Sequence, residues 1–338
     1  MSATMKAVQL HEFGGPEVLR YEDVAVPDIA EDQVLVRVHA VGVNPPDWYL
    51  RDGYRMLPPE WQPALHFPVI PGTDISGEVA AVGAAVRDFQ VGDAVFGMVR
   101  FPSYGDSAAY AEYVAAPAGD LARKPAGIDH LHAAAAPMAA LTAYQFLIDL
   151  GHDVANPLQP GKHQPVPLAG KTVLINGAAG GVGHLALQLA KLHGATVIAV
   201  ASGGHQAFLR GLGADRFIDY TKGALADAVD GVDLVLDTVG GAAATRFLPL
   251  IKRGGALFPV FPLGFDGADE AARLGVTVSA TQVRSNGAQL AVLGELMEAG
   301  KLQVAIDSRF ALQDAAAAHA RAANGHIRGK IVLTVLAE

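Results

Sequence analysis

The chain has 338 residues, 51% hydrophobic and 17% charged, with no cysteine and a net charge of -9. That length predicts two domains with packed cores, and the composition excludes disordered and collagen-like chains. The missing cysteine excludes disulfides, thiolate nucleophiles and cysteine-ligated zinc or iron–sulfur sites, and the negative charge argues against a nucleic-acid partner.

The first 130 residues predict a compact, mostly antiparallel β domain. Short β-rich runs at 34–41, 76–82, 94–99 and 108–116 are separated by Gly, Pro and Asp. Proline-rich stretches predict long surface loops at 45–46, 58–59 and 68–71. The N-terminus has no apolar run long enough for a signal peptide, so we expect a soluble, cytoplasmic protein.

An Ala- and Leu-rich segment at 133–150 predicts a helix whose regular part follows Pro137. The next stretch, 151–170, is rich in Pro, His, Gln and Gly and has no periodicity, which predicts a surface loop. We expect the histidines of this region to be surface polar residues: His130, His132, His152 and His163.

From Lys171 onward apolar runs alternate with helical patterns, which predicts a parallel sheet covered on both faces. The strand-like runs are 172–176, 196–201, 216–218, 232–237, 256–261 and 276–280, and the helical ones are 182–193, 206–212 and 242–251. Residues 172–190 carry no charge, but a glycine turn divides them, so no membrane span is predicted. The tail has strand texture from Lys301 and completes the β domain. The expected domains are 1–130 with 303–338, and 131–302.

The strongest motif is the turn Gly177-Ala-Ala-Gly-Gly-Val-Gly183, which follows a strand and opens a helix. Gly177, Gly180 and Gly183 allow a tight turn, close approach to a pyrophosphate and helix–strand packing. The first-turn amides and the helix dipole then face the anion. This context predicts a dinucleotide site rather than an ordinary turn.

The second strand indicates which dinucleotide binds. NAD enzymes usually end this strand with an acid that bonds the ribose 2′-hydroxyl, whereas residues 196–205 contain none. Ser202 and glycines stand there instead, with His205 and Arg210 nearby, and these groups accept a 2′-phosphate. The sequence therefore favours NADPH, although Ser202 could also cap the following helix.

Along nearly its whole length the chain resembles the medium-chain dehydrogenase/reductase superfamily, in its zinc-free quinone oxidoreductase branch. The matching stretches are Gly42-Val-Asn-Pro-Pro-Asp-Trp-Tyr49, Phe67-Pro-Val-Ile-Pro-Gly-Thr-Asp74, Val91-Gly-Asp-Ala-Val-Phe-Gly97, Tyr110-Ala-Glu-Tyr113, Ala140-Leu-Thr-Ala-Tyr144, the glycine turn, Leu212-Gly-Ala-Asp-Arg-Phe-Ile-Asp-Tyr220, Asp237-Thr-Val-Gly-Gly241 and Gly329-Lys-Ile-Val-Leu333. The resemblance implies an α/β protein, with a GroES-like β-barrel catalytic domain and a doubly wound Rossmann cofactor domain, and a homodimer.

The resemblance also implies roles for single residues. Asn44 and Tyr49 should lie near the nicotinamide ribose and the acceptor, with Tyr49 donating to the developing oxyanion. The other expected cofactor contacts are Thr142 at the nicotinamide or a phosphate, Ala179, Gly180, Gly181 and Val182 at the pyrophosphate, Ser202 at the 2′-phosphate, Tyr220 at the adenosine and Val239 at its ribose. Lys330 is a candidate phosphate contact, against the alternative of a solvated lysine on a β edge.

Zinc alcohol dehydrogenases of this superfamily have Cys where this chain has Asn44, and His-Glu where it has Thr73-Asp74. We therefore expect no metal, and hydride transfer from NADPH to a quinone or an α,β-unsaturated carbonyl, whose reduced anion is stabilised by conjugation. Two alternatives remain open: an enoyl-thioester reductase, and a non-catalytic NADPH-binding sensor or scaffold.

Overall fold

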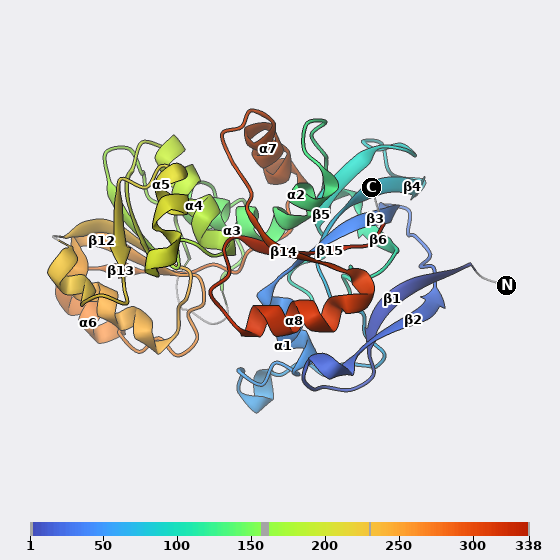
Figure 1. The fold of residues 1–338 in the computed structure, drawn as a ribbon, viewed down its shortest axis with the longest axis horizontal. Helices are drawn as coiled ribbons and strands as arrows, with labels where there is room; N and C mark the ends of the chain where they lie inside the picture. Colours follow the sequence, from blue (N-terminus) through green and yellow to red (C-terminus); the bar gives the residue numbers. More distant parts are fainter. Residues whose placement is uncertain (1–2, 157–161, 230, 337–338) are drawn as a thin grey trace. The chain divides into compact units, whose positions relative to one another are not determined.

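A computed structural model of the chain describes residues 3–156, 162–229 and 231–336. By its internal contacts the chain divides into two compact units (Figure 1). The first unit comprises Met1–Leu141, Arg284–Ala299 and Ile306–Glu338, and the second comprises Thr142–Val283 and Gly300–Ala305. Residues 131–141 and 284–299, which the sequence division assigned to the cofactor domain, thus group with the first unit.

The first unit is built on a mostly antiparallel sheet with strand order β14-β15-β3-β4-β5-β7, and β6 also pairs with β3. The strands are β3 (Gln33–Val43), β4 (Asp74–Val82), β5 (Ala94–Met98), β6 (Tyr113–Pro117), β7 (Leu121–Arg123), β14 (Ile306–Ala311) and β15 (Lys330–Thr334). Within β3, Val34, Val36 and Val38 are fully buried while Arg37 is exposed. This period of two places one face of the sheet on the core. The predicted β domain is confirmed.

A hairpin and several helices complete the first unit. The hairpin joins β1 (Thr4–Leu10) to β2 (Leu19–Ala25), and the α-helices are α1 (Pro45–Arg51), α2 (His130–Ala135), α7 (Gly287–Glu298) and α8 (Ala315–Ala323). Short 3-10 turns occupy Pro16–Val18, Pro59–Trp61, Ala118–Asp120 and Leu312–Asp314. Helix α8 interrupts a tail for which only strands were predicted, because its seven alanines favour helix.

Two proline positions are informative. Pro137 opens α3 (Pro137–Leu147), so the helical segment breaks there, as predicted. Pro45 and Pro46, expected in a loop, instead form the first turn of α1. A proline fits the first helical positions because its missing N–H has no partner there anyway.

The second unit holds a parallel sheet with strand order β10-β9-β8-β11-β12-β13. The strands are β8 (Thr172–Asn176), β9 (Thr196–Ala201), β10 (Arg216–Asp219), β11 (Val232–Asp237), β12 (Ile251–Pro259) and β13 (Thr277–Val278). The helical segments are α4 (Gly181–Leu192), α5 (Gln206–Gly211), α6 (Ala268–Leu274) and the 3-10 segments Gly203–His205, Leu225–Ala228 and Ala242–Leu250. The chain starts at β8, in the middle of the sheet, and winds first to one side and then to the other. Ligands bind where such a sheet reverses its strand order.

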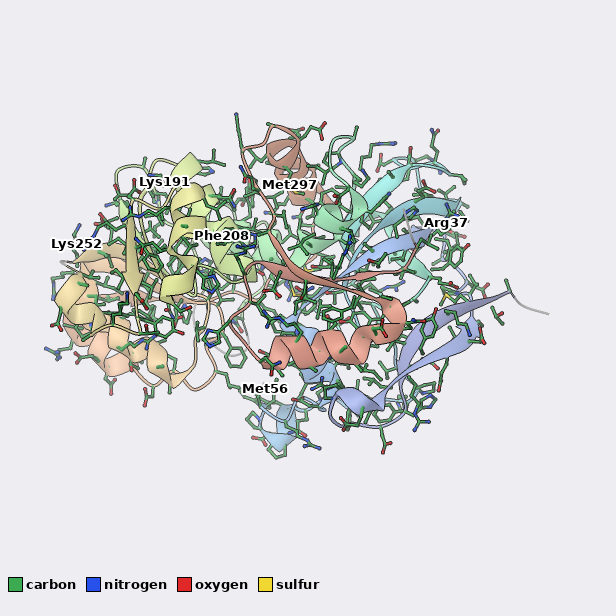
Figure 2. The ribbon with its side chains drawn as sticks, viewed as in Figure 1. Arg37, Met56, Lys191, Phe208, Lys252 and Met297 are labelled. Carbon is green, nitrogen blue, oxygen red and sulfur yellow. The ribbon has the colours of Figure 1, made fainter. Side chains whose placement is uncertain are left out.

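Salt bridges fix the amino ends of two central strands. Lys191 and Lys252, both labelled in Figure 2, pair with Asp215 and Asp233 at 2.8 and 3.2 Å. Each carboxylate also accepts the first amides of a strand, from Val197 in β9 and from Thr172 in β8. The salt bridges thus lie at the amino ends of these strands, whereas the glycine turn lies at the carboxyl end of β8.

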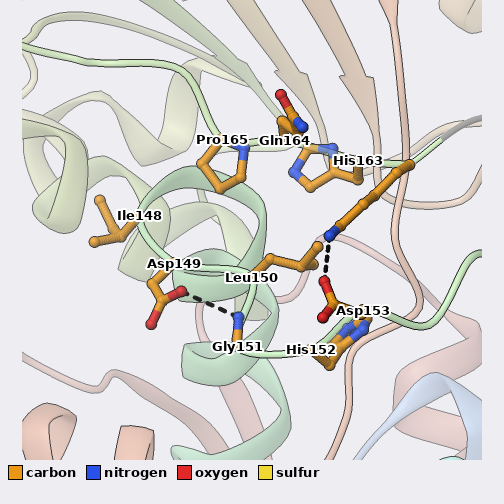
Figure 3. A pocket seen from close by; sticks show the side chains of 10 residues that line it. Ile148, Asp149, Leu150, Gly151, His152, Asp153, His163, Gln164 and Pro165 are labelled. Carbon is orange, nitrogen blue, oxygen red and sulfur yellow. Dashed lines mark hydrogen bonds and ion pairs between the residues drawn. The ribbon is translucent and has the colours of Figure 1, made fainter.

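The stretch 151–170 is irregular, as expected, and residues 157–161 of it lie outside the described residues. Its residues 151–153 and 162–165 line the pocket of Figure 3, together with residues 148–150, which directly follow α3. The expectation of surface polarity is wrong for His163, which is 2% exposed. Its imidazole Nε2 lies 3.0 Å from the Phe146 carbonyl, and its Nδ1 lies 2.9 Å from the Ser279 hydroxyl. A buried imidazole needs both partners, and only the tertiary structure supplies them.

Candidate functional site

The glycine turn has the geometry that a bound pyrophosphate requires. Gly177 adopts a φ of +70°, which favours glycine. A Cβ on Gly183 would lie 2.3 Å from the Gly177 carbonyl oxygen, so no side chain fits there. A Cβ on Gly180 would meet only one atom, at 3.4 Å, so the backbone at that position borders open space. Two glycines therefore shape the turn, and the third leaves room for a ligand.

The start of α4 offers donors to an anion. Gly180 is its N-cap and no side chain caps the helix, which continues for 12 residues. The amides of the first turn and the positive end of the helix dipole consequently remain for a ligand. Gly181 and Val182 are partly exposed here, whereas Ala179 is buried. These positions fit the phosphates of a dinucleotide.

The carboxyl end of the neighbouring strand β11 lies beside this turn. Asn176 donates from Nδ2 to Asp237 Oδ1 at 2.7 Å, and Thr238 Oγ1 donates to the Asn176 carbonyl at 2.8 Å. Val239, which is 61% exposed, follows these residues, and its side chain would lie 3.1 Å from a Cβ on Gly177. The structure thus brings Val239 to the glycine turn. Sequence reasoning did not assign roles to Asn176 and Asp237, although both end strands of the expected sheet.

At the end of β9 the structure adds a carboxylate that the sequence reasoning missed. Asp219 ends β10, pairs in register with Ala201 and lies so close to Gly203 that a Cβ there would be 2.4 Å from Oδ2. Thr221 donates to it, and Lys222 Nζ lies 3.7 Å away, so its pKa is lowered and it is ionised at neutral pH. A carboxylate from the neighbouring strand β10 thus lies at the end of β9, which has no acid of its own.

The other expected groups at this end differ in availability. Ser202 is partly exposed and Tyr220 is 46% exposed. Arg210 is held by the backbone carbonyl of Ala214 at 3.2 Å and by that of Asp215. Ser202 and Tyr220 remain candidates for the adenosine end, whereas Arg210 has a local structural role.

In the first unit Asn44 lies at the centre of a buried polar cluster. It is the N-cap of α1 and 2% exposed. Its Nδ2 donates to Asp74 Oδ2 at 2.9 Å and to the Gly42 carbonyl at 3.2 Å. Its Oδ1 accepts from Lys330 Nζ. Within the capping box of α1 the side chain also accepts from the Asp47 backbone amide, so the amide is held in one orientation.

Lys330 is buried, and the alternative of a solvated lysine is wrong. Lys330 is the first residue of β15 and is 5% exposed. Its ammonium donates to the Val43 carbonyl at 2.7 Å as well as to Asn44. Burial lowers its pKa, and the nearby Asp74 and Asp47 oppose that shift. The antiparallel pairing of β15 with β3 brings the ammonium inside.

Asp74 completes this cluster. Both of its carboxylate oxygens accept from the Met138 amide, at 3.1 and 3.0 Å, near the start of α3. Burial raises the pKa of Asp74 to about 6, against the lowering influence of Lys330 and Asn44. The Asp74 carboxylate therefore links strand β4 to helix α3 and to the side chain of Asn44.

Tyr49 lies on α1, five residues after Asn44, and packs against the buried cluster of Leu10, Leu50, Tyr54 and Val69. Burial, and secondarily Asp52, raise the pKa of its phenol. It is therefore protonated and able to donate a hydrogen bond.

The predicted site residues are divided between the two units. Asn44, Tyr49 and Lys330 belong to the first unit. Thr142, which is 4% exposed, belongs to the second unit with the glycine turn.

The cluster does not fit a zinc ion. Zinc takes thiolate, imidazole or carboxylate ligands in a tetrahedron, whereas Asn44 and Asp74 bond to each other and the Lys330 ammonium supplies the positive charge. Within the described residues no three His, Cys, Asp or Glu side chains form a group that could hold a metal. We therefore derive no step through zinc.

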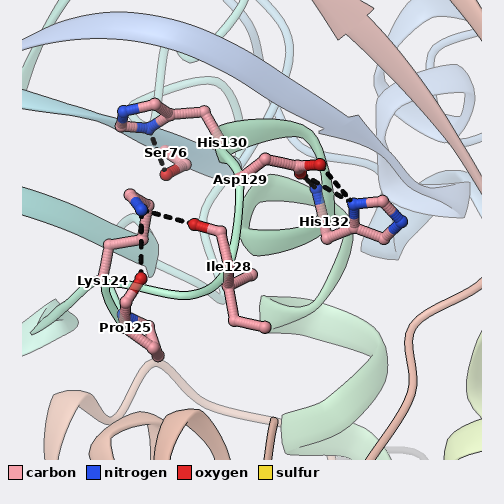
Figure 4. A network of polar contacts seen from close by, with 7 residues as sticks. All are labelled: Ser76, Lys124, Pro125, Ile128, Asp129, His130 and His132. Carbon is pink, nitrogen blue, oxygen red and sulfur yellow. Dashed lines mark hydrogen bonds and ion pairs between the residues drawn. The ribbon is translucent and has the colours of Figure 1, made fainter. Parts of the chain in front are cut away.

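Two further histidines of the first unit, His130 and His132, form local hydrogen bonds (Figure 4). His130 Nδ1 lies 2.8 Å from Ser76 Oγ, and its ring stacks on His39 at 4.1 Å. Burial lowers the pKa of His130 to about 4, with help from His39 and Lys124, so the ring is neutral. It is half-buried, not the surface residue expected. His132 bonds to Asp129 at the start of α2 and is exposed.

Comparison with known proteins agrees with this architecture. Residues 30–126 match the alcohol dehydrogenase GroES-like domain family, and residues 212–333 match a family described as zinc-binding dehydrogenase. Among the described residues no helix is long and apolar enough to cross a membrane.

Three similar proteins span nearly the whole chain. A chloroplastic quinone-oxidoreductase homolog of Spinacia oleracea is 33% identical over 97% of this chain and 98% of its own. A chloroplastic NADPH-dependent alkenal/one oxidoreductase of Arabidopsis thaliana is 35% identical over 97% of this chain and 79% of its own. The solved quinone oxidoreductase of Coxiella burnetii is 34% identical, covers 99% of this chain and 100% of its own, and superimposes with a TM-score of 0.84. The chain belongs to the quinone oxidoreductase-like branch of the medium-chain dehydrogenase/reductase superfamily and is an oxidoreductase that uses a nicotinamide cofactor.

Proposed function

We propose that this oxidoreductase reduces a quinone or an α,β-unsaturated carbonyl with NADPH, without a metal. The observation that carries the proposal is the Lys330–Asn44–Asp74 cluster, which has no zinc donor set where zinc relatives bind the metal. An acceptor that needs no Lewis acid suits such a site, and the similar proteins include quinone and alkenal/one oxidoreductases. NADPH, when bound, supplies the hydride.

The residues of the chain bind and orient the reactants. Asn44 stays the residue that we expect near the nicotinamide ribose, in the orientation that Asp74 and Lys330 give it. Tyr49 donates to the oxygen of the acceptor as negative charge develops there. Lys330 holds Asn44 in place, and its expected contact with a phosphate stays a prediction.

The second unit would hold the dinucleotide. Backbone groups of Ala179, Gly180, Gly181 and Val182 face the pyrophosphate, with Ser202 and Tyr220 at the adenosine end, Val239 at its ribose and Thr142 at the nicotinamide or a phosphate. The choice of NADPH is supported by the strand β9, which carries no acid, and by the NADPH dependence named for one relative. The ionised Asp219 carboxylate would repel the 2′-phosphate of NADPH, so we expect a moderate preference for NADPH over NADH.

The test is NADPH oxidation by the purified chain with a panel of small quinones and enones, with and without chelator. We expect turnover that chelator leaves unchanged. Inactivity across the panel, or loss of activity with chelator, would overturn the proposal. Activity on a short 2-enoyl-CoA alone would identify an enoyl-thioester reductase, and tight NADPH binding with no turnover would identify a sensor or scaffold.

A cytoplasmic location and a homodimer complete the proposal. Both rest on the sequence arguments above. Cell fractionation tests the first, and the mass of the purified protein in solution tests the second; a monomer would overturn the dimer.

A further inference from the structure

Asp47 is a buried carboxyl with one oxygen bonded and the other unbonded. The residue lies on α1 and is 1% exposed. Its Oδ2 accepts from the Asn44 amide at 2.8 Å and from the Tyr110 hydroxyl at 3.0 Å. Its Oδ1 has no hydrogen-bond partner among the described residues. A buried carboxylate oxygen without a donor is costly, which indicates that Oδ1 carries a proton or binds water.

A directed chain of hydrogen bonds determines which oxygen carries the proton. Arg51 Nη1 lies 3.0 Å from His319 Nδ1, and because arginine can only donate, Nδ1 accepts. The His319 ring is neutral, since burial lowers its pKa to about 3, so its hydrogen is on Nε2, 3.0 Å from the Tyr110 oxygen. Tyr110 in turn donates to Asp47 Oδ2. Because Oδ2 accepts two donors, the carboxyl proton resides on Oδ1.

The charges of the cluster also require a proton. Asp47, Asp74 and Lys330 are all buried, so two carboxylates would face a single ammonium. Lys330 acts mainly on Asp74, whose carboxylate it helps to stabilise, and only weakly on Asp47. Burial accordingly raises the pKa of Asp47 to about 7, against donation from Asn44 and Tyr110 and with repulsion from Asp74. One bound proton removes the excess negative charge.

Asp47 lines a small cavity within the first unit. Besides Asp47 it is lined by Thr73, Ser103 and Ser107 and by apolar side chains that include Tyr54 and Ile70. The space open to the centre of a water molecule is about 10 Å³, enough for one water. Thr73 Oγ1 faces the Asp74 carboxylate but makes no hydrogen bond of good geometry among the described residues. A water between Asp47 Oδ1 and Thr73 Oγ1 would satisfy both atoms.

We propose that Asp47 stores the proton that each reduction consumes and gives it up from Oδ1, through a water beside Thr73, to the reduced acceptor. This inference rests on the proposed function. The acceptor gains a hydride from NADPH and a proton from Asp47, so the enolate or hydroquinone anion becomes neutral. Asp47 is left as a carboxylate, held by Asn44 and Tyr110, and regains a proton from solvent water through the same cavity. Tyr49 stabilises the anion, and Asp47 neutralises it.

The decisive variant is Asp47→Asn. The amide can keep every hydrogen bond, with its oxygen toward Asn44 and Tyr110 and its NH₂ toward Thr73, but it has no proton to transfer. We expect NADPH affinity to be retained and the melting temperature to equal that of the wild type at low pH and to exceed it near neutrality, while turnover falls roughly 100-fold. In the wild type, kcat should decline as pH rises through about 7, and this decline should disappear in the variant. Unchanged turnover in Asp47→Asn would overturn the proposal.

Two further variants separate proton transfer from structure. Tyr110→Phe removes a donor to Oδ2, so the carboxyl remains but its pKa rises further; turnover at low pH should persist and the decline should move to higher pH. Asp120→Asn is the matched control, because Asp120 is another partly buried carboxyl of the first unit with a raised pKa, bonded only to the Arg100 amide in the described structure. Its turnover and pH profile should not change. A pH profile that does not move in Tyr110→Phe would contradict the assignment.

An infrared measurement tests the stored proton without turnover. The wild type should show a protonated-carboxyl band that titrates near pH 7, above the titration of Asp74 at about 6, and Asp47→Asn should lack the component near pH 7. Absence of that band from the wild type would overturn the inference whatever the activity. If the band is present but no quinone or enone is reduced, the proposed function fails and the catalytic use of the proton fails with it.

Discussion

Lys330, at the start of β15, donates its buried ammonium to the side-chain oxygen of Asn44, which directly follows the neighbouring strand β3 and lies 286 positions earlier in the chain. The contact orients Asn44 and gives Asp74 a counter-charge. Lys330 thereby supplies the buried positive charge of this cluster.

Replacing Lys330 with Met should destabilise the fold strongly. The substitution keeps the apolar stem but leaves the buried Asp74 carboxylate without its cation, which typically costs about 3–5 kcal/mol. Chemical denaturation measures the loss. The control is Lys252→Met, which breaks an exposed pair with Asp233 and should cost no more than about 1 kcal/mol. Equal losses of unfolding free energy in the two variants would show that the buried pair stabilises the fold no more than the exposed one.

The stability of the protein should depend on the protonation of Asp47. Its pKa rises from 3.8 to about 7 on folding, because burial disfavours the charged form. Between these values the folded state keeps a proton that the unfolded chain has released, so raising the pH favours unfolding. The contribution of Asp47 is therefore largest at low pH and is lost as pH rises to about 7. Unfolding free energies of wild type and Asp47→Asn should diverge over this range; parallel curves would contradict the raised pKa.

Asp219→Asn should strengthen the preference for NADPH. The ionised carboxylate lies against Gly203, beside the expected 2′-phosphate site at Ser202, and repels that phosphate. We expect KM for NADPH to fall severalfold while KM for NADH changes little. Asp269→Asn, an exposed acid on α6, makes the same change in net charge and should leave both constants unaltered. A ratio of constants that stays the same in Asp219→Asn would place the phosphate elsewhere.

Gly183→Ala should damage both the fold and cofactor binding. The new methyl group would stand 2.3 Å from the Gly177 carbonyl, so the turn must shift, at a cost of about 1–3 kcal/mol. Gly211→Ala is the matched control at the end of α5, where a Cβ meets nothing within 4 Å. This control should be neutral or stabilising by about 0.4–1 kcal/mol. Thermal melting and NADPH fluorescence titration check both variants, and an undamaged Gly183→Ala would rule out the close approach.

Tyr49→Phe should lower turnover while NADPH affinity stays nearly constant. The variant removes the phenol that we expect to donate to the developing oxyanion, and loss of one such donor costs roughly 100-fold in kcat. Tyr21→Phe, on the exposed hairpin, serves as the control. Turnover that survives in Tyr49→Phe would mean that the ring only positions the acceptor.

Much of the cofactor unit could be predicted from local patterns. The strands β8, β9 and β11 begin and end where apolar runs begin and end, and the glycine turn was found from its three glycines. These features depend on neighbours in sequence, because strand, turn and helix preferences act over a few residues. The helix α8 was missed although its alanines favour helix, because the runs on both sides of it are strand-like; it packs on β14 and β15.

The sequence by itself determined the fold class, the glycine turn and the absence of cysteine ligands, since each is legible in a short segment or in the composition. The tertiary structure alone decided that Lys330 is buried on Asn44, that Asp219 approaches Gly203 and that Tyr110 and His319 meet Asp47. These partners are distant in sequence or lie on different strands. Burial and strand register, which set charge and pKa, exist only once the chain has folded.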